Sequence, residues 1–149
     1  MATVNDILIR VRRKIGDMQK LKVSDDELII ALNEAIDALS GKLCIDNEAE
    51  LIKTITLTGT TPLARPADFI KFVGQYPIQF ATDGSGNVTL LHLDTAFAGT
   101  LTARYFAVKS KVVALADTVP FTRSVHQTML VDTTAAAFMQ NDTAPKAKE

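Results

Sequence analysis

Hydrophobic side chains recur with a helical period between Val23 and Leu43. Ser24 and Glu27 stand at the start with the spacing of a capping box, in which a hydroxyl and a carboxylate each bind a free N–H of the helix start. The pattern predicts a long helix that begins after Ser24 and ends near Gly41 or shortly after it. Its apolar stripe recurs every three or four residues and comprises Leu28, Leu32, Ala35, Ile36, Leu39 and Leu43.

Two further segments show helical features. Thr3 to Ile15 is amphipathic, with Thr3 placed to cap its start and Gly16 placed to end it. The link from Asp17 to Val23 is short, so the first two helices are expected to pack as a hairpin. Phe121 to Gln140 contains neither Gly nor Pro and predicts a third helix, although its threonines have only modest helix propensity.

Between the second and third predicted helices, apolar and polar residues alternate with a period of two, which is typical of β-strands. The segment Asp83 to Asn87, with its two glycines, predicts a hairpin turn. We therefore expect an α+β fold, in which a small helical bundle carries an inserted antiparallel β-sheet or half-barrel of four to five strands. The predicted strands are Glu50–Thr58, Phe69–Val73, Tyr76–Ala81, Val88–Leu93 and Gly99–Phe106.

The length of 149 residues favours one domain with a real hydrophobic core. We expect a helical hairpin over residues 1–48 and a β-region over 49–108. A connection and closing helix over 109–140 and an extended tail over 141–149 follow. The tail is too polar to fold by itself, and Pro145 would interrupt a continued helix.

Composition narrows the function classes. The net charge is −1 and the pI is about 6.1, whereas a dedicated nucleic-acid-binding domain is usually basic. Cys44 is the only cysteine, so the chain forms no internal disulfide, and Cys44 is expected to be a small buried hydrophobe. No apolar run approaches the ~20 residues of a membrane span, so we expect a soluble cytoplasmic protein without a membrane partner.

The candidate catalytic and metal-binding residues do not make a convincing site. Ser124, His126 and Asp132 lie on one predicted helix without the G-x-S-x-G turn of a hydrolase. His92 and His126 are the only histidines, whereas a metal site needs three or four converging ligands. The segment Asp83 to Asn87 lacks the oxygen series and terminal Glu of a calcium loop. We predict no enzymatic activity, no cofactor and no metal.

The basic run at the end of the first helix is the most unusual feature of the composition. Four of the five residues in this run are cationic, namely Arg10, Arg12, Arg13 and Lys14. The fifth, Val11, is apolar. Such a run could bind DNA phosphates or an acidic protein surface. A solvated helix face is the alternative, and the sequence leaves both open.

Three stretches resemble head-to-tail adaptor proteins of tailed bacteriophages, also called connector or head-completion proteins. Asp6 to Asp17 is similar to the family pattern I-R-x-x-[IL]-x-D, and Val23 to Ala35 is similar to S-D-x-E-L-[IL]-x-x-[IL]-N-E-A. Arg65 to Ile70 resembles the L-P-x-D-F turn after the family's first strand. The closing helix and polar tail follow in the family's order, although this helix is rich in Thr where the family's is rich in Ala and Leu.

The resemblance implies a structural virion subunit, assembled in the host cytoplasm, that forms a ring of commonly 12 copies at the head–tail interface. It implies contacts with the portal protein and with a stopper or tail component, and a lumen through which DNA passes. In the family the closing helix and tail dock on the portal. The partner-binding residues that we predict are Arg10, Arg12, Arg13, Lys14, Asn141, Asp142, Lys146 and Lys148.

Two alternatives remain at this point. The first two helices could form a small nucleic-acid-binding module of the helix-turn-helix type. The acidic start of the second helix, Asp25 to Glu27, disfavours this reading because that end would face phosphates. A tail-terminator or another minor virion protein is the second alternative.

Overall fold

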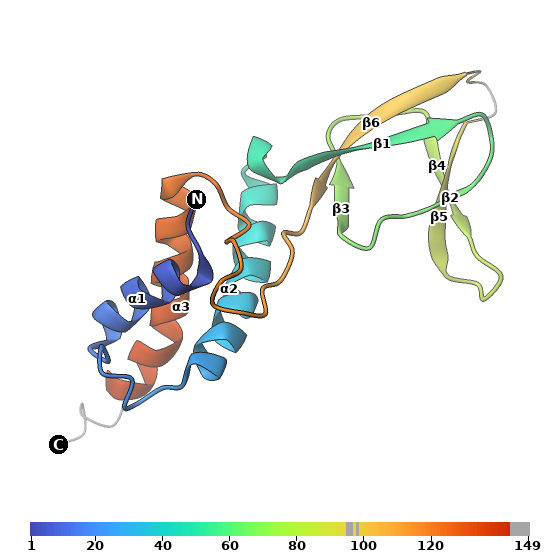
Figure 1. Ribbon diagram of the computed structural model, residues 1–149. Helices are drawn as coiled ribbons and strands as arrows, with labels where there is room; N and C mark the ends of the chain where they lie inside the picture. Colours follow the sequence, from blue (N-terminus) through green and yellow to red (C-terminus); the bar gives the residue numbers. More distant parts are fainter. Residues whose placement is uncertain (95–96, 98, 144–149) are drawn as a thin grey trace. The chain divides into compact units, whose positions relative to one another are not determined.

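The computed structural model describes residues 1–94, 97 and 99–143 (Figure 1). The predicted α+β class is confirmed: two N-terminal helices and one C-terminal helix enclose a β-region in the sequence. The chain divides into two compact units. The helical unit comprises Met1–Lys42 and the chain from Lys109 onward, and the β-unit comprises Leu43–Val108.

Helix α1 (Val4–Ile15) begins and ends where its local sequence predicts. The Thr3 hydroxyl accepts a hydrogen bond from the Asp6 N–H at 3.2 Å, and the Thr3 N–H donates to the Asp6 carboxylate at 3.0 Å. Both halves of a capping box are therefore present. Gly16 ends the helix with a φ of +73°, a left-handed conformation that glycine adopts without strain.

Helix α2 (Asp25–Ile45) carries the predicted apolar stripe, and all six stripe residues are buried. The Ser24 hydroxyl accepts from the Glu27 N–H at 3.2 Å, as expected of the N-cap. The Glu27 carboxylate lies 3.4 Å from the same hydroxyl, where the capping box predicted a bond to the backbone N–H of Ser24. The helix continues one turn past Gly41, since buried Leu43 and Cys44 still favour the helical register.

Helix α3 (Ser124–Thr143) begins three residues later than predicted and extends into the predicted tail. The interpretation of residues 141–143 as tail is therefore wrong, because nothing in the sequence before Pro145 prevents the helical hydrogen bonds from continuing. The rest of the tail, residues 144–149, lies outside the described residues. The buried side of α3 comprises His126, Leu130, Val131, Thr134 and Ala135.

Among the helices, the most extensive backbone contact joins α1 with α3. Arg10 Nη2 donates to Thr128 Oγ1 at 2.9 Å, and the Lys14 ammonium forms an ion pair with Asp132. The loop over residues 17–23 folds around Asp17. The packing of the first two helices as a hairpin stays a prediction.

The predicted connection over residues 109–120 is anchored to α2. Asn33 Nδ2 donates to the Val112 carbonyl at 2.9 Å, and the Val112 N–H donates back to Asn33 Oδ1 at 2.8 Å. The Lys109 N–H also donates to Ser40 Oγ at 3.1 Å. Polar side chains on α2 thus fix the segment that leads to α3.

The β-unit contains two three-stranded antiparallel sheets, with the orders β1–β6–β3 and β2–β5–β4 (Figure 1). The sequence predicted one sheet of four to five strands. The additional strand, β2, has only two residues, which is too short to show a period of two. After a 3₁₀ turn at Ala49–Leu51, the strands are β1 (Ile52–Thr58), β2 (Leu63–Ala64), β3 (Phe69–Phe72), β4 (Ile78–Thr82), β5 (Val88–Leu93) and β6 (Thr100–Ala107).

The β-unit has its own small core, formed by Leu57 of β1 with Leu91 and Leu93 of β5. Part-buried apolar side chains from both sheets and from the segment between β5 and β6 pack around these three leucines. They are Ile55, Phe72, Ile78, Phe97 and Leu101.

The predicted hairpin turn joins β4 to β5. The Asp83 carboxylate accepts hydrogen bonds from the N–H groups of Ser85 at 2.8 Å and Asn87 at 3.0 Å, and from the Thr89 hydroxyl at 2.9 Å. These bonds, led by the one from Asn87, lower the pKa of Asp83. The carboxylate therefore organises a turn, as the sequence indicated.

Candidate functional site

The basic run does not form a single cationic surface. Arg12 is buried, with 3% of its surface exposed, so it does not lie on a solvated face, and its partner-binding role stays a prediction. Arg10 binds Thr128, and Lys14 pairs with Asp132. Arg13 is exposed. Each of the other three side chains is held by a partner within the helical unit.

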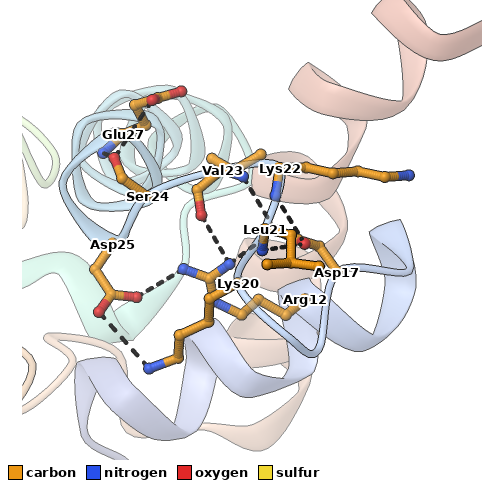
Figure 2. A network of polar contacts seen from close by, with 9 residues as sticks. All are labelled: Arg12, Asp17, Lys20, Leu21, Lys22, Val23, Ser24, Asp25 and Glu27. Carbon is orange, nitrogen blue, oxygen red and sulfur yellow. Dashed lines mark hydrogen bonds and ion pairs between the residues drawn. The ribbon is translucent and has the colours of Figure 1, made fainter.

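Arg12 is the centre of a polar network at the junction of α1 and α2 (Figure 2). Its Nη1 lies 3.0 Å from Asp17 Oδ2 and 2.9 Å from the Val23 carbonyl oxygen. Its Nη2 lies 2.7 Å from Asp25 Oδ1. One guanidinium thus contacts the end of the first helix, the loop and the start of the second helix, using the directional donors that distinguish Arg from Lys.

Asp17 shapes the loop between the two helices. Its carboxylate accepts the N–H groups of Leu21 at 2.9 Å and of Lys22 and Val23 at 3.0 Å (Figure 2). Burial raises the pKa of Asp17, but the three N–H bonds and the charge of Arg12 outweigh it, so the net shift is downward. Asp17 is therefore ionised at neutral pH, and its role is to hold the loop.

Asp25 occupies the first turn of α2, where the helix dipole favours a negative charge. Its hydrogen bond with Arg12 is the main reason that its pKa is lowered, with desolvation opposing the shift. Lys20 Nζ lies 3.8 Å from Asp25 Oδ2. The sequence predicted the helix-end charge of Asp25 but missed its partner on α1.

One sequence signal could have found this network. Arg12 and Asp17 stand five residues apart on either side of Gly16, whose left-handed conformation turns the chain so that the acid faces the arginine. They are also the Arg and Asp of the I-R-x-x-[IL]-x-D pattern, with Val11 in place of Ile. The residues that carry the family resemblance therefore hold the junction together.

The C-terminal residues predicted to bind a partner are only partly described. Asn141 and Asp142 belong to the last turn of α3. Lys146 and Lys148 lie outside the described residues. The partner-binding role of these four residues stays a prediction.

The residues considered for hydrolytic chemistry have other surroundings. His126 is 2% exposed and lies edge-on to the Phe121 ring, with a centroid separation of 6.2 Å. Asp132 pairs with Lys14, and Ser124 is exposed at the start of α3. Across residues 1–94, 97 and 99–143, no three His, Cys, Asp or Glu side chains are grouped to hold a metal ion.

A second polar cluster lies in the β-unit, at the stretch that resembles the L-P-x-D-F turn. Lys53 Nζ lies 2.6 Å from Asp68 Oδ2, and the Tyr105 hydroxyl donates to Asp68 Oδ1 at 3.3 Å. The hydrogen bond with Asp68 raises the pKa of Lys53. Burial, followed by the Asp68 charge, raises the pKa of Tyr105. Lys53 and Tyr105 both stay protonated at neutral pH. Through Asp68 the cluster joins β1 and β6 to the turn before β3.

No family model matches the chain, and no curated protein is significantly similar to it. In the described part of the chain, no helix is both long and apolar enough to cross a membrane. What the chain does must therefore be inferred from its own residues and short motifs.

Proposed function

We propose that this protein is a structural virion subunit that forms the ring joining the portal to the tail in the neck of a tailed bacteriophage. DNA passes through the lumen of the ring. The subunit acts by contact with its neighbours, with the portal and with a stopper or tail component. It has no catalytic activity, cofactor or metal, and it is assembled into the particle in the host cytoplasm.

One observation carries this proposal: the polar residues of the adaptor-like motifs hold the junctions of the helical unit. Arg12 of the first motif pairs with Asp17 of the same motif and with Asp25 of the second. Asn33, also in the second motif, anchors the connection that leads to α3. The residues shared with the family pattern thus specify a geometry, as a structural subunit requires, and do not converge on a reacting group.

The exposed apolar side chains of α3 also support the proposal. Val125 is 50% exposed and Met139 is 46% exposed. The resemblance implies that this helix docks on the portal, and apolar side chains that remain exposed on a helix are suited to such a contact. The nucleic-acid-binding alternative is weaker, because burial of Arg12 removes the centre of its basic run.

The direct test is assembly with the portal protein of the same virus. Native mass measurement of the mixture should show portal rings carrying several copies of this chain, and 12 copies are expected if the ring follows the family's common number. Electron cryomicroscopy of the particle neck should place the chain between portal and tail. If the protein does not bind portal rings but does bind DNA fragments, the nucleic-acid-binding alternative is supported instead.

The portal-facing surface can be tested by truncation. Deleting residues 144–149 leaves α3 intact, so the melting temperature should stay unchanged while attachment to portal rings weakens and becomes less sensitive to salt. Lys42→Glu, an exposed charge change on α2, is the matched control and should leave attachment unchanged. Full head completion by the truncated chain would place the portal-facing surface elsewhere.

A further inference from the structure

Among the described residues of the β-unit, the two sheets have four strand edges, and three of them are short or irregular. Strand β2 has two residues, and β3 has a register shift between Phe69 and Lys71. Strand β4 has five residues, with a register shift between Ala81 and Thr82. Short strands, bulges and covering groups are the usual protections of sheet edges.

Strand β1 is neither short nor bulged, and no described strand pairs with its outer edge. It pairs with β6 in unbroken register over seven residues, from Ile52 opposite Phe106 to Thr58 opposite Thr100. It contains no Pro or Gly. Its one charged side chain, Lys53, is occupied by Asp68. A long, regular and nearly uncharged edge of β-branched residues is suited to pairing with another strand.

The phase of the β1–β6 ladder shows which backbone groups point outward. The Gly59 N–H donates to the Gly99 carbonyl at 3.0 Å, just beyond the end of β1. Bonding and non-bonding residues alternate in an antiparallel pair, so Lys53, Ile55 and Leu57 bond to β6. The intervening groups face away from β6, and no described strand pairs with that edge. They are the N–H groups of Thr54, Thr56 and Thr58 and the carbonyls of Ile52, Thr54, Thr56 and Thr58.

The side chains of β1 present two distinct faces. On one face Thr56 and Thr58 meet Thr102 and Thr100 across the strand pair, with the hydroxyl oxygens 3.3 Å apart in each case. On the other face Ile55 is part-buried against the leucine core of the β-unit. A further strand would therefore meet hydroxyls on one side and, on the other, aliphatic groups together with Lys53, which is held by Asp68.

We propose that two copies of this chain pair through β1, antiparallel and about a two-fold axis at Ile55. In this register Thr54 of one copy stands opposite Thr56 of the other, so outward N–H and carbonyl groups meet in both directions. Each Thr58 N–H meets the Ile52 carbonyl of the other copy. Threonine faces threonine, as it does between β1 and β6, and Ile55 faces its own counterpart, which extends both cores.

A second copy is the occupant because β1 is complementary to itself in this register. The described remainder of the chain offers no other edge of similar length and regularity, so a contact between two copies must use the same edge twice. Such a contact is isologous and closes at two subunits. The two β1–β6–β3 sheets then form one continuous sheet, and neither copy leaves β1 open to further pairing.

The pairing goes beyond the proposed adaptor role. Neighbours in a cyclic ring contact each other head to tail and are not related by a two-fold axis. The β1 dimer is therefore a form of the free protein that protects the edge before assembly.

Proline substitution tests the edge without breaking the sheet. Thr56→Pro removes an outward N–H and leaves the bonds to β6 in place, since Pro is tolerated where the N–H faces away from the neighbouring strand. The dimer dissociation constant should rise by about 100-fold or more because several interstrand bonds are lost together. Thr56→Val keeps the N–H and should leave the constant nearly unchanged. Sedimentation across a dilution series measures both.

Two controls separate loss of pairing from loss of folding. Thr54→Pro alters an equivalent outward position and, like Thr56→Pro, should be monomeric. Its melting curve should match that of monomeric Thr56→Val. Ile55→Pro removes an N–H that bonds to β6 and should lower the melting temperature. A dimer that survives Thr56→Pro and Thr54→Pro in folded protein overturns the proposal.

The register can be tested by cross-linking in a chain whose buried cysteine is replaced, Cys44→Ala. Ile55→Cys places a thiol opposite its own copy in a non-hydrogen-bonded pair, with Cα atoms about 4.5 Å apart, within the range of a disulfide. Oxidation should give a covalent dimer. In Thr54→Cys the new thiol lies opposite Thr56 of the other copy and not opposite a second thiol. This variant should therefore cross-link much less. Equal yields from the two variants overturn the two-fold register.

The outcomes also separate this inference from the adaptor proposal. A wild-type chain that is monomeric throughout the dilution series overturns the β1 dimer, whether or not the chain binds portal rings. A dimer that is lost in Thr56→Pro supports it, and portal binding measured with the same variant tests the adaptor role independently.

Discussion

Arg12 and Asp25 face each other across the junction of α1 and α2, with Arg12 Nη2 2.7 Å from Asp25 Oδ1. The arginine is 3% exposed, and its other terminal nitrogen contacts buried Asp17. One cation therefore compensates two carboxylates at the point where the chain turns from the first helix to the second. The stability of the helical unit should depend on this single side chain more than on any neighbouring cation.

Replacing Arg12 with Met should destabilise the protein by about 3–5 kcal/mol, because it leaves two carboxylates without their compensating charge. Arg13→Met removes the exposed neighbour and should change the free energy of unfolding by no more than about 0.5 kcal/mol. Urea denaturation of both variants measures the difference. Similar losses in the two variants would show that Arg12 is not an interior group.

Acid should weaken the same junction. The pKa of Asp17 is lowered in the folded protein, below the unfolded value of about 3.9. Ionised Asp17 therefore stabilises the fold above about pH 4, and that contribution is lost as the pH falls through the folded-state pKa. Unfolding measured from neutral to acidic pH should show this loss. Asp17→Asn should be less stable at pH 7 and depend less steeply on pH in the acid range.

A charge within the α2 stripe should be far more damaging than one on the exposed side of the helix. Leu32 is fully buried and Ile30 is 62% exposed. Leu32→Asp should cost more than about 4 kcal/mol or prevent folding, since it buries an unpaired carboxylate. Ile30→Asp should leave the melting curve close to that of the parent. Equivalent melting of the two variants would refute the assignment of the buried face.

The N-cap of α2 should make a smaller, local contribution. Ser24→Ala removes the oxygen that accepts the Glu27 N–H and should cost about 1 kcal/mol. Ser24→Asp keeps an acceptor at this position and should retain most of the stability. Thermal melts of the parent, Ser24→Ala and Ser24→Asp test this capping role. If Ser24 made no capping contribution, the three melting curves would coincide.

The sequence by itself determined the elements whose signals are local. The repeat from Leu28 to Leu43 identified the buried side of α2, because residues three and four apart necessarily share a helix face. Thr3, Gly16 and Ser24 marked helix ends through contacts that span only a few residues. The Asp83 turn was predictable for the same reason.

Only the tertiary structure decided which surfaces these elements share. Arg12 and Arg13 are adjacent cations with the same local preference, and burial separates them because Arg12 faces Asp17 and Asp25 while Arg13 does not. The division of the strands into two sheets, and the exposed edge of β1 within one of them, depends on pairings between segments distant in sequence. A periodic pattern reports which side of an element is apolar. It carries no information about which distant side chain or strand lies opposite, and in this protein that pairing decides which charge is buried and which strand edge stays open.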